Sequence, residues 1–217
     1  MLCALLIPFA SFFLASPVFG QHPNIFINQG EINAIKAKVQ ANVQPWKNAY
    51  NEMISDANSA LNQSILSVTY QGNSGHNYYT QAPYDWSNNL PSPCGGNYCD
   101  GQINPQADRG DYSAAIALGK AVRDLGLGYA FTGNSNYAEK AIDLINAWTI
   151  DSATYMTPEI TNNQSNIELY ITMPGMFYGA DLIWNYSGWN ASERSAFVAW
   201  VDDLVNDAMG SSFDNNF

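Results

Sequence analysis

The stretch YSAAIALGKAVRDLGLGYAF, residues 112–131, decides the fold class of this chain. Its apolar residues recur at intervals of three and four, which places them on one face of an α-helix: Ala115, Leu118, Val122 and Leu125. Thr132-Gly133-Asn134 then ends the pattern, as glycine does after the last turn of many helices. The sequence therefore predicts a long helix that stops at Gly133.

Helical patterns lie on both sides of this stretch. Residues 31–62 form a first helical region, which Pro45 must bend or break because proline removes a donor from the helix. Residues 137–148 and 191–209 are amphipathic, whereas residues 167–184 are apolar on nearly all sides and contain Pro174, which predicts a kinked, buried helix. An Asn followed three residues later by Glu predicts three helix starts, at Asn28, Asn136 and Asn190.

Buried and amphipathic helices that alternate in hairpins predict an all-α fold, an incomplete (α/α) toroid in which inner and outer helices form part of a ring. An ordinary helical bundle would show a similar pattern. Five or six helices supply only part of such a ring, so we expect the chain to be truncated at its C-terminal end relative to a whole toroid. No strand-like alternation of comparable length occurs.

The first 20 residues have the apolar run and small-residue end of a secretory signal peptide. We expect residues 1–20 to be removed and residues 21–217 to form one extracellular domain. Of the three cysteines, Cys94 and Cys99 then remain, and their close spacing in a secreted chain predicts a local disulfide. A zinc pair is the competing interpretation, but no second Cys or His pair follows nearby.

Charge excludes several classes of partner. The net charge is −11 with eight Lys and Arg residues, so the chain lacks the basic face that nucleic acid or an anionic membrane requires. We expect neither partner, and no cofactor or metal. Four Asn-x-Ser triplets, at Asn62, Asn163, Asn185 and Asn190, fit a secreted glycoprotein.

Residues 67–108 lack helical periodicity, and a loop of this length in a compact domain is usually functional. Within it, residues 76–86 contain one His, three Tyr and one Trp: His76, Tyr78, Tyr79, Tyr84 and Trp86. Aromatic faces stack on pyranose rings, and phenolic groups hydrogen-bond to sugar hydroxyls. The loop therefore predicts a carbohydrate-binding site.

The stretch from His76 through Trp86 to Pro91 resembles one that precedes the helical repeats in the alginate-lyase superfamily of toroidal polysaccharide lyases. Residues 129–141, with Trp148, look like the recurrent helical repeat of that family, and Asn162-Asn163-Gln164 precedes a buried helix as in its members. The resemblance implies β-elimination on a 1,4-linked uronic-acid polymer of the alginate or glucuronan type. An acidic polysaccharide is then the expected partner.

The resemblance also implies roles for individual residues. Asn162 and Asn163 match the amides that neutralise the uronate carboxylate in the family, so no excess of basic charge is required. Gln164 stands where many members have His, and Gln cannot act as a base. The proton is then moved by a tyrosine, Tyr79 or Tyr84, by His76, or by a residue beyond Phe217.

Other residues are candidates for substrate contact: Tyr78, Trp86, Arg109 and Glu168. Arg109 lies between Asp108 and Asp111, which favours a local ion pair over a carboxylate contact. Glu168 lies in an otherwise apolar helix, where it is either a structural partner or an acid with a perturbed pKa.

Two other functions stay open. A toroidal glycoside hydrolase would need a pair of carboxylates, for which Asp85, Asp100, Asp108, Asp111 and Glu168 are available. A non-catalytic carbohydrate-binding protein would also fit the absence of the expected His.

Overall fold

A computed structural model describes residues 20–70, 75–87, 91–160 and 162–211 of the chain. The described part contains six α-helices: α1 (Gln29–Gln40), α2 (Trp46–Ala60), α3 (Gly110–Thr132), α4 (Ser135–Thr149), α5 (Asn163–Ile183) and α6 (Ala191–Ser211). A 3-10 turn, η1 (Val68–Tyr70), and two short strands, β1 (Asn77–Tyr78) and β2 (Thr157–Ile160), complete it. The all-α prediction is confirmed. Residues 1–19 of the expected signal peptide lie outside the described residues, so that prediction and the domain boundary stay predictions.

Short polar signals set where the helices start. The Asn28 side chain accepts from the backbone N–H of Glu31, and the Glu31 side chain accepts from that of Asn28, which is the reciprocal cap predicted from their spacing. Asn190 accepts from the backbone of Glu193 at 2.9 Å, as predicted. The predicted cap at Asn136 is wrong, because α4 begins two residues earlier and Asn134 accepts from the Asn136 N–H.

Proline and glycine set the breaks between helices. Pro45 separates α1 from α2, so the predicted interruption of the first helical region is confirmed. Gly133 ends α3 with φ of 73°, a left-handed conformation that glycine adopts without steric cost. Pro174, in contrast, lies inside α5, and the helix continues through it.

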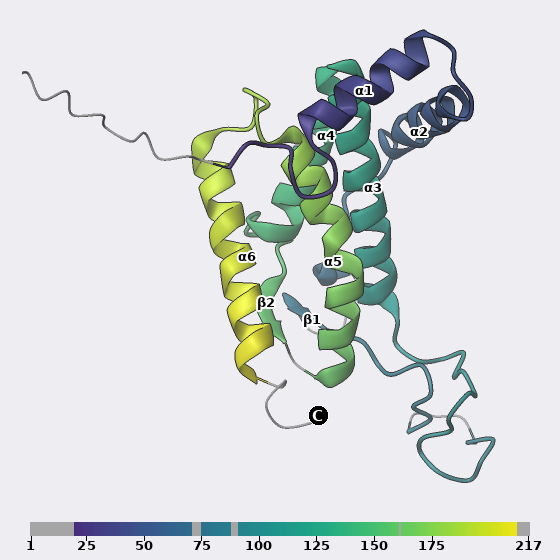
Figure 1. Cartoon of the computed structure of the whole chain (residues 1–217). Coiled ribbons are helices and arrows are strands. Elements are labelled where there is room, and N and C mark those ends of the chain that lie inside the picture. The colour runs from purple at the N-terminus through teal and green to yellow at the C-terminus, as the bar shows by residue number, and fades with distance from the viewer. Residues whose placement is uncertain (1–19, 71–74, 88–90, 161, 212–217) are drawn as a thin grey trace, which may run out of the picture.

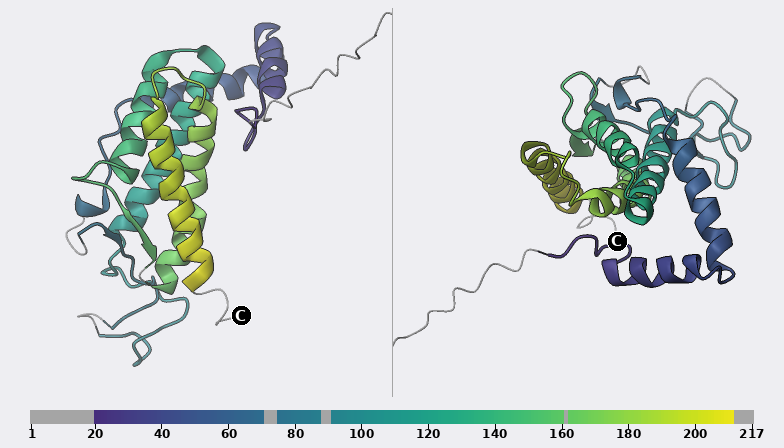
Figure 2. Two further views of the ribbon diagram at one scale, coloured as in Figure 1. Left: turned by 90° about the vertical axis from the view of Figure 1, so that its left-hand side faces the viewer. Right: turned by 90° about the horizontal axis from the view of Figure 1, so that it is seen from above.

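The helices are arranged in two layers. α3 and α5 lie side by side and run in the same direction, while α4 and α6 run the opposite way behind them (Figures 1 and 2). This alternation is that of inner and outer helices in an (α/α) toroid. Large buried side chains fill the core between the layers, among them Trp148, Met176 and Trp189. α1 and α2 form a corner beside the end of the bundle at which α3 and α5 finish.

Glycines allow α3 and α5 to approach closely. A Cβ atom added at Gly119 would lie 2.5 Å from the carbonyl oxygen of Thr172, and one added at Gly179 would lie 2.2 Å from that of Val122. Both distances are far below van der Waals contact, so only glycine fits at these positions. The two helices therefore meet backbone to backbone, and their first turns are held at a fixed separation.

The prediction of a buried helix holds for only one face of α5. One face of the helix is open to solvent and exposes Ile167 by 56%, Tyr170 by 46% and Ile171 by 65%. Its opposite face packs against α3 and α4. Within the described residues, no helix combines the length and apolar character needed to cross a membrane.

The segment before α1 is tied to the end of α5. Asp181, which is 3% exposed, accepts hydrogen bonds from the backbone N–H groups of Asn24 and Ile25 at 2.7 and 2.8 Å. His22 Nδ1 makes a further short contact with the same carboxylate, and its ring packs against Trp184. A single buried carboxylate therefore fastens residues 22–25 to the helical layers.

Candidate active site

The candidate site lies where α3 and α5 begin. Because the two helices are parallel and adjacent, their N-terminal ends meet at the same end of the bundle (Figure 1). The aromatic loop enters this end through β1 and leaves it at Arg109, the residue that precedes α3. Asn162 precedes α5 in the same way. Residues more than 80 positions apart, such as Thr80 and Asn162, are thereby brought within hydrogen-bond distance.

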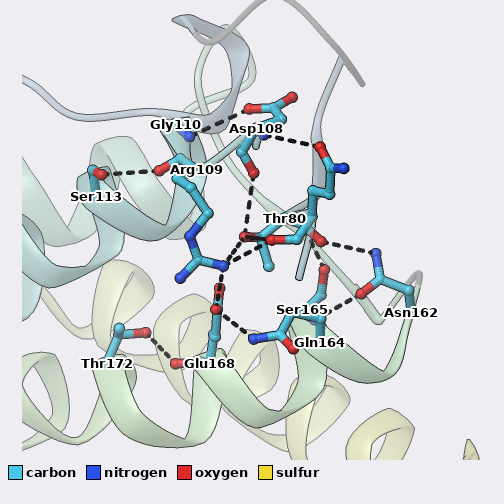
Figure 3. Close-up of polar contacts among 11 residues, drawn as sticks. Thr80, Asp108, Arg109, Gly110, Ser113, Asn162, Gln164, Ser165, Glu168 and Thr172 are labelled. Atoms are coloured by element: carbon cyan, nitrogen blue, oxygen red, sulfur yellow. Dashed lines mark hydrogen bonds and ion pairs between the residues drawn. The ribbon is translucent and has the colours of Figure 1, made fainter. Parts of the chain in front are cut away.

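Arg109 is the centre of a polar network (Figure 3). Its Nη1 atom donates to the Thr80 hydroxyl and to the carbonyl of Gln81, both at 2.9 Å, and forms an ion pair with Glu168 at 2.5 Å. The guanidinium group also lies over the Tyr112 ring, 4.2 Å from its centroid. The local pairing expected with the flanking aspartates is wrong, since the counter-charge comes from α5.

Glu168 is the buried member of this ion pair. It is 3% exposed, and its Oε1 atom also accepts from the Gln164 amide at 2.6 Å. Its other carboxylate oxygen, Oε2, is buried with no hydrogen-bond partner among the described residues. The carboxylate therefore balances and orients Arg109 from below. Direct substrate binding by Glu168, predicted from the sequence, is not supported, because the side chain is enclosed.

The three residues Asn162, Asn163 and Gln164 have different environments. Asn162 caps α5, since its side chain accepts from the Ser165 N–H at 2.8 Å while its amide donates to the Thr80 carbonyl at 3.4 Å. Gln164 is half-buried and engaged with Glu168. Asn163, in the first turn of α5, is exposed. Of the three amides, the structure leaves that of Asn163 most accessible from solvent.

The two neighbouring tyrosines of the loop have opposite surroundings. Tyr78 is 0% exposed, so it cannot stack on a substrate as predicted. Burial, followed by the nearby charges of Glu168 and Asp111, raises the pKa of its phenol far above the ordinary value. Tyr79 is 38% exposed, and its backbone N–H donates to Asp111 at 2.9 Å. Tyr79 is therefore the tyrosine that the loop presents to solvent beside the Arg109 network.

Asp111 is a functional candidate whose surroundings the sequence did not reveal. It lies in the first turn of α3, is 3% exposed, and uses Oδ2 to accept from Tyr79. Its Oδ1 atom is buried with no hydrogen-bond partner among the described residues. Burial raises the pKa of this carboxyl to about 6, against the lowering effect of the Tyr79 N–H. The sequence signal that could have identified Asp111 is an acidic residue in the first turn of a helix. Such residues are common on protein surfaces, so the signal does not single it out.

His76 directly precedes β1. Its Nδ1 atom is 2.6 Å from the Tyr155 carbonyl, and its ring stacks on that of Tyr155 at 4.4 Å. Because a carbonyl only accepts, Nδ1 carries the proton and Nε2 of the neutral ring is the acceptor nitrogen. The Nδ1 partner of His76 is therefore a loop carbonyl and not a member of the Arg109 network.

The loop between β1 and α3, which contains Tyr84 and Trp86, projects from the end of the bundle (Figure 1). Tyr84 meets Tyr98 edge to face at 6.2 Å, and the Trp86 indole donates to the Gln102 carbonyl at 2.9 Å. These ring and hydrogen-bond partners lie within the loop itself. Tyr84 and Trp86 are therefore each held by a contact within the loop.

The loop is closed by the predicted disulfide. Cys94 and Cys99 are bonded, with their Cα atoms 5.8 Å apart, so the zinc-pair interpretation is wrong. Elsewhere in the described residues, no group of three or more His, Cys, Asp or Glu side chains is placed to hold a metal ion. Arg109, Tyr79 and Asn163 are partly or fully exposed groups at this end of the bundle, and Asp111 is a buried carboxylate that holds the Tyr79 backbone.

Comparison with known proteins gives two findings. A family model described as alginate lyase matches residues 66–216. A crystal structure of an alginate lyase from Bacteroides ovatus is similar with a TM-score of 0.73 and 26% sequence identity, over 88% of this chain and 55% of that chain. The chain thus spans about half the length of that solved protein. No curated protein matches it.

Proposed function

The chain belongs to the alginate lyase family, and from that premise we propose that it takes part in cleaving a 1,4-linked uronic-acid polymer by β-elimination. The observation that carries the proposal is the network at the shared end of α3 and α5. Arg109 is the oriented cation of this network, and an exposed phenol and an exposed amide directly precede two of its members: Tyr79 precedes Thr80, and Asn163 precedes Gln164.

The uronate carboxylate needs a neutralising partner, because its charge otherwise opposes removal of the adjacent proton. Asn163 offers an amide N–H at the start of α5, where the helix dipole also favours an anion. Arg109 offers guanidinium donors at the same end of the bundle, with its side chain 24% exposed and both its orientation and its charge balance set by Glu168. These two groups bind the carboxylate in the proposed reaction.

The elimination step moves one proton off carbon and one onto oxygen. A base removes the proton at C5, the electron pair forms the C4–C5 double bond, and the bond from C4 to the glycosidic oxygen breaks. That oxygen then accepts a proton from an acid. We assign Tyr79 to proton transfer, because it is the tyrosine of the β1 region that is both exposed and anchored at the network.

The same proposal includes secretion. The apolar start of the chain has the pattern of a signal peptide, and disulfides persist in oxidising compartments outside the cytosol. An extracellular location fits a polymeric substrate that does not enter cells. Expression of the full chain in a secreting host, with N-terminal sequencing of the medium fraction, tests this; retention inside the cell would contradict it.

The reaction is tested by incubating the protein with polymannuronate, polyguluronate and glucuronan and following ultraviolet absorbance of the new double bond. Tyr79→Phe removes the proton that the phenol transfers and is expected to lower turnover by about 100-fold or more. Asn163→Ala is expected to reduce turnover through loss of carboxylate neutralisation, by about 10- to 100-fold.

Tyr50→Phe is the matched control. Tyr50 contacts Phe131 near the far end of α3, roughly 30 Å from Arg109 along the helix. Tyr50→Phe should therefore leave turnover unchanged. Full activity in both Tyr79→Phe and Asn163→Ala would mean that the active site does not lie at this end of the bundle. Release of reducing sugar without a double bond would favour a hydrolase, and glycan binding without turnover would favour a non-catalytic protein.

A further inference from the structure

Asp111 joins the two elements that meet at the candidate site. It belongs to the first turn of α3, and its carboxylate holds the backbone N–H of Tyr79, which directly follows β1. The side chain is 3% exposed, although Asp is rarely buried without a cationic partner. Arg109, two residues away, pairs with Glu168 instead. The carboxylate therefore holds a backbone group of the loop and balances no cation in the site.

The hydrogen bond bears on where the Tyr79 side chain points. Tyr79 follows Tyr78, which is fully buried, so the chain turns from core to solvent between these two residues. The Tyr79 N–H lies at this turn, and Asp111 Oδ2 accepts from it at 2.9 Å. This hydrogen bond orients the peptide plane at Tyr79 and so restricts the directions in which its side chain can leave the backbone.

We propose that Asp111 is a positioning residue that acts through the main chain of Tyr79, and that its ionisation couples turnover to pH. The inference rests on the proposed function, because it concerns how the tyrosine that transfers the proton is positioned. An ionised carboxylate accepts a stronger, charge-assisted hydrogen bond from the N–H than a protonated one does. The loop is then held best when Asp111 carries its charge.

The titratable groups that interact with Asp111 include Asp108, which precedes α3, and Tyr78 on β1. Tyr78 in turn interacts with Arg109, Tyr112 and Glu168. Arg109 and Glu168 form an ion pair, which leaves Asp108 as the charge that opposes ionisation of Asp111. The pKa of about 6 that results places the change within the range of ordinary enzyme assays.

Two substitutions separate the hydrogen bond from the charge. Asp111→Ala removes the acceptor, so kcat should fall by up to about 100-fold with little change in KM, because misplacement of a reacting group acts on the chemical step. Asp111→Asn keeps a neutral oxygen acceptor, so its kcat should lie between those of Asp111→Ala and the unmodified protein. It should also lack the acid limb near pH 6 that we expect of the unmodified protein. Asp143→Asn removes an exposed charge on α4, and it should leave kcat and its dependence on pH unchanged.

Hydrogen exchange of the Tyr79 amide tests the same inference without turnover. At one pH, the amide should be protected in the unmodified protein and in Asp111→Asn, and should lose protection in Asp111→Ala. Equal protection in all three, or an acid limb that survives in Asp111→Asn, would overturn the proposal. If the unmodified protein forms no double bond on any uronate, the proposed function fails, and the exchange result still decides whether Asp111 holds Tyr79.

Discussion

The backbone contact between α3 and α5 predicts a large cost for one added methyl group. In Gly179→Ala, the new Cβ would lie 2.2 Å from the carbonyl oxygen of Val122, 2.5 Å from its carbonyl carbon and 2.7 Å from its Cγ1. Carbon atoms in contact sit about 3.5–4.0 Å apart, so the two helices must separate by roughly 1 Å. A flexible side chain could move away, but a helical carbonyl cannot do so alone.

The magnitude follows from two opposing effects. Overpacking in a core costs about 1–3 kcal/mol, and the upper end applies here because the obstacle is backbone. Alanine in place of glycine favours the helix by about 1 kcal/mol. We therefore expect the free energy of unfolding of Gly179→Ala to fall by about 2 kcal/mol, and Tm by about 4–8 °C for a domain of this size.

Urea denaturation followed by tryptophan fluorescence measures this change, since the chain has six Trp residues. Gly133→Ala is the matched control: its new Cβ meets nothing within 4 Å, and the strain comes only from φ of 73°. We expect a smaller loss there, of about 1 kcal/mol. If Gly179→Ala proves as stable as the unmodified protein or more stable, the close approach of α3 and α5 is refuted.

Three further substitutions test the buried carboxylates. Glu168→Gln leaves Arg109 without its counter-charge and should lower the free energy of unfolding by roughly 3 kcal/mol in urea denaturation; no loss would mean that the pair is dispensable. Asp181→Ala leaves the donors of residues 22–25 unpaired, which should cost about 2–3 kcal/mol and speed proteolysis of that segment. The pKa of Asp111 is raised from 3.8 to about 6, so burial of its ionised form lowers stability progressively as pH rises between those values. Asp111→Asn should therefore stabilise the fold by about 2–3 kcal/mol at neutral pH and by nothing at about pH 3; a constant difference across that range would contradict the assignment.

Many of the helices could be predicted from short-range signals in the sequence. The period of residues 112–131, the stop at Gly133 and the reciprocal cap of Asn28 and Glu31 all involve groups within a few positions of one another. Such signals act before tertiary packing and can be recognised in one segment. The start of α4 was misplaced by two residues because Asn134 and Asn136 are both competent caps, and only the backbone conformation selects between them.

The open face of α5 could not be read from its composition. Its residues are apolar on nearly all sides, a pattern that is typical of complete burial. Which side of the helix meets α3 depends on the contacts at Gly119 and Gly179, and these involve atoms more than 50 positions apart. The exposed Ile167 and Ile171 are the consequence of that docking.

What the sequence alone determined is the kind of residue available at the site: tyrosines in a long loop, amides at the start of α5 and an arginine before α3. What only the tertiary structure decided is what each one does. Arg109 pairs with Glu168, 59 positions away, because parallel helices bring their first turns together. Tyr78 and Tyr79 are identical and adjacent, yet one is enclosed and the other exposed, since successive residues of an extended chain point to opposite sides.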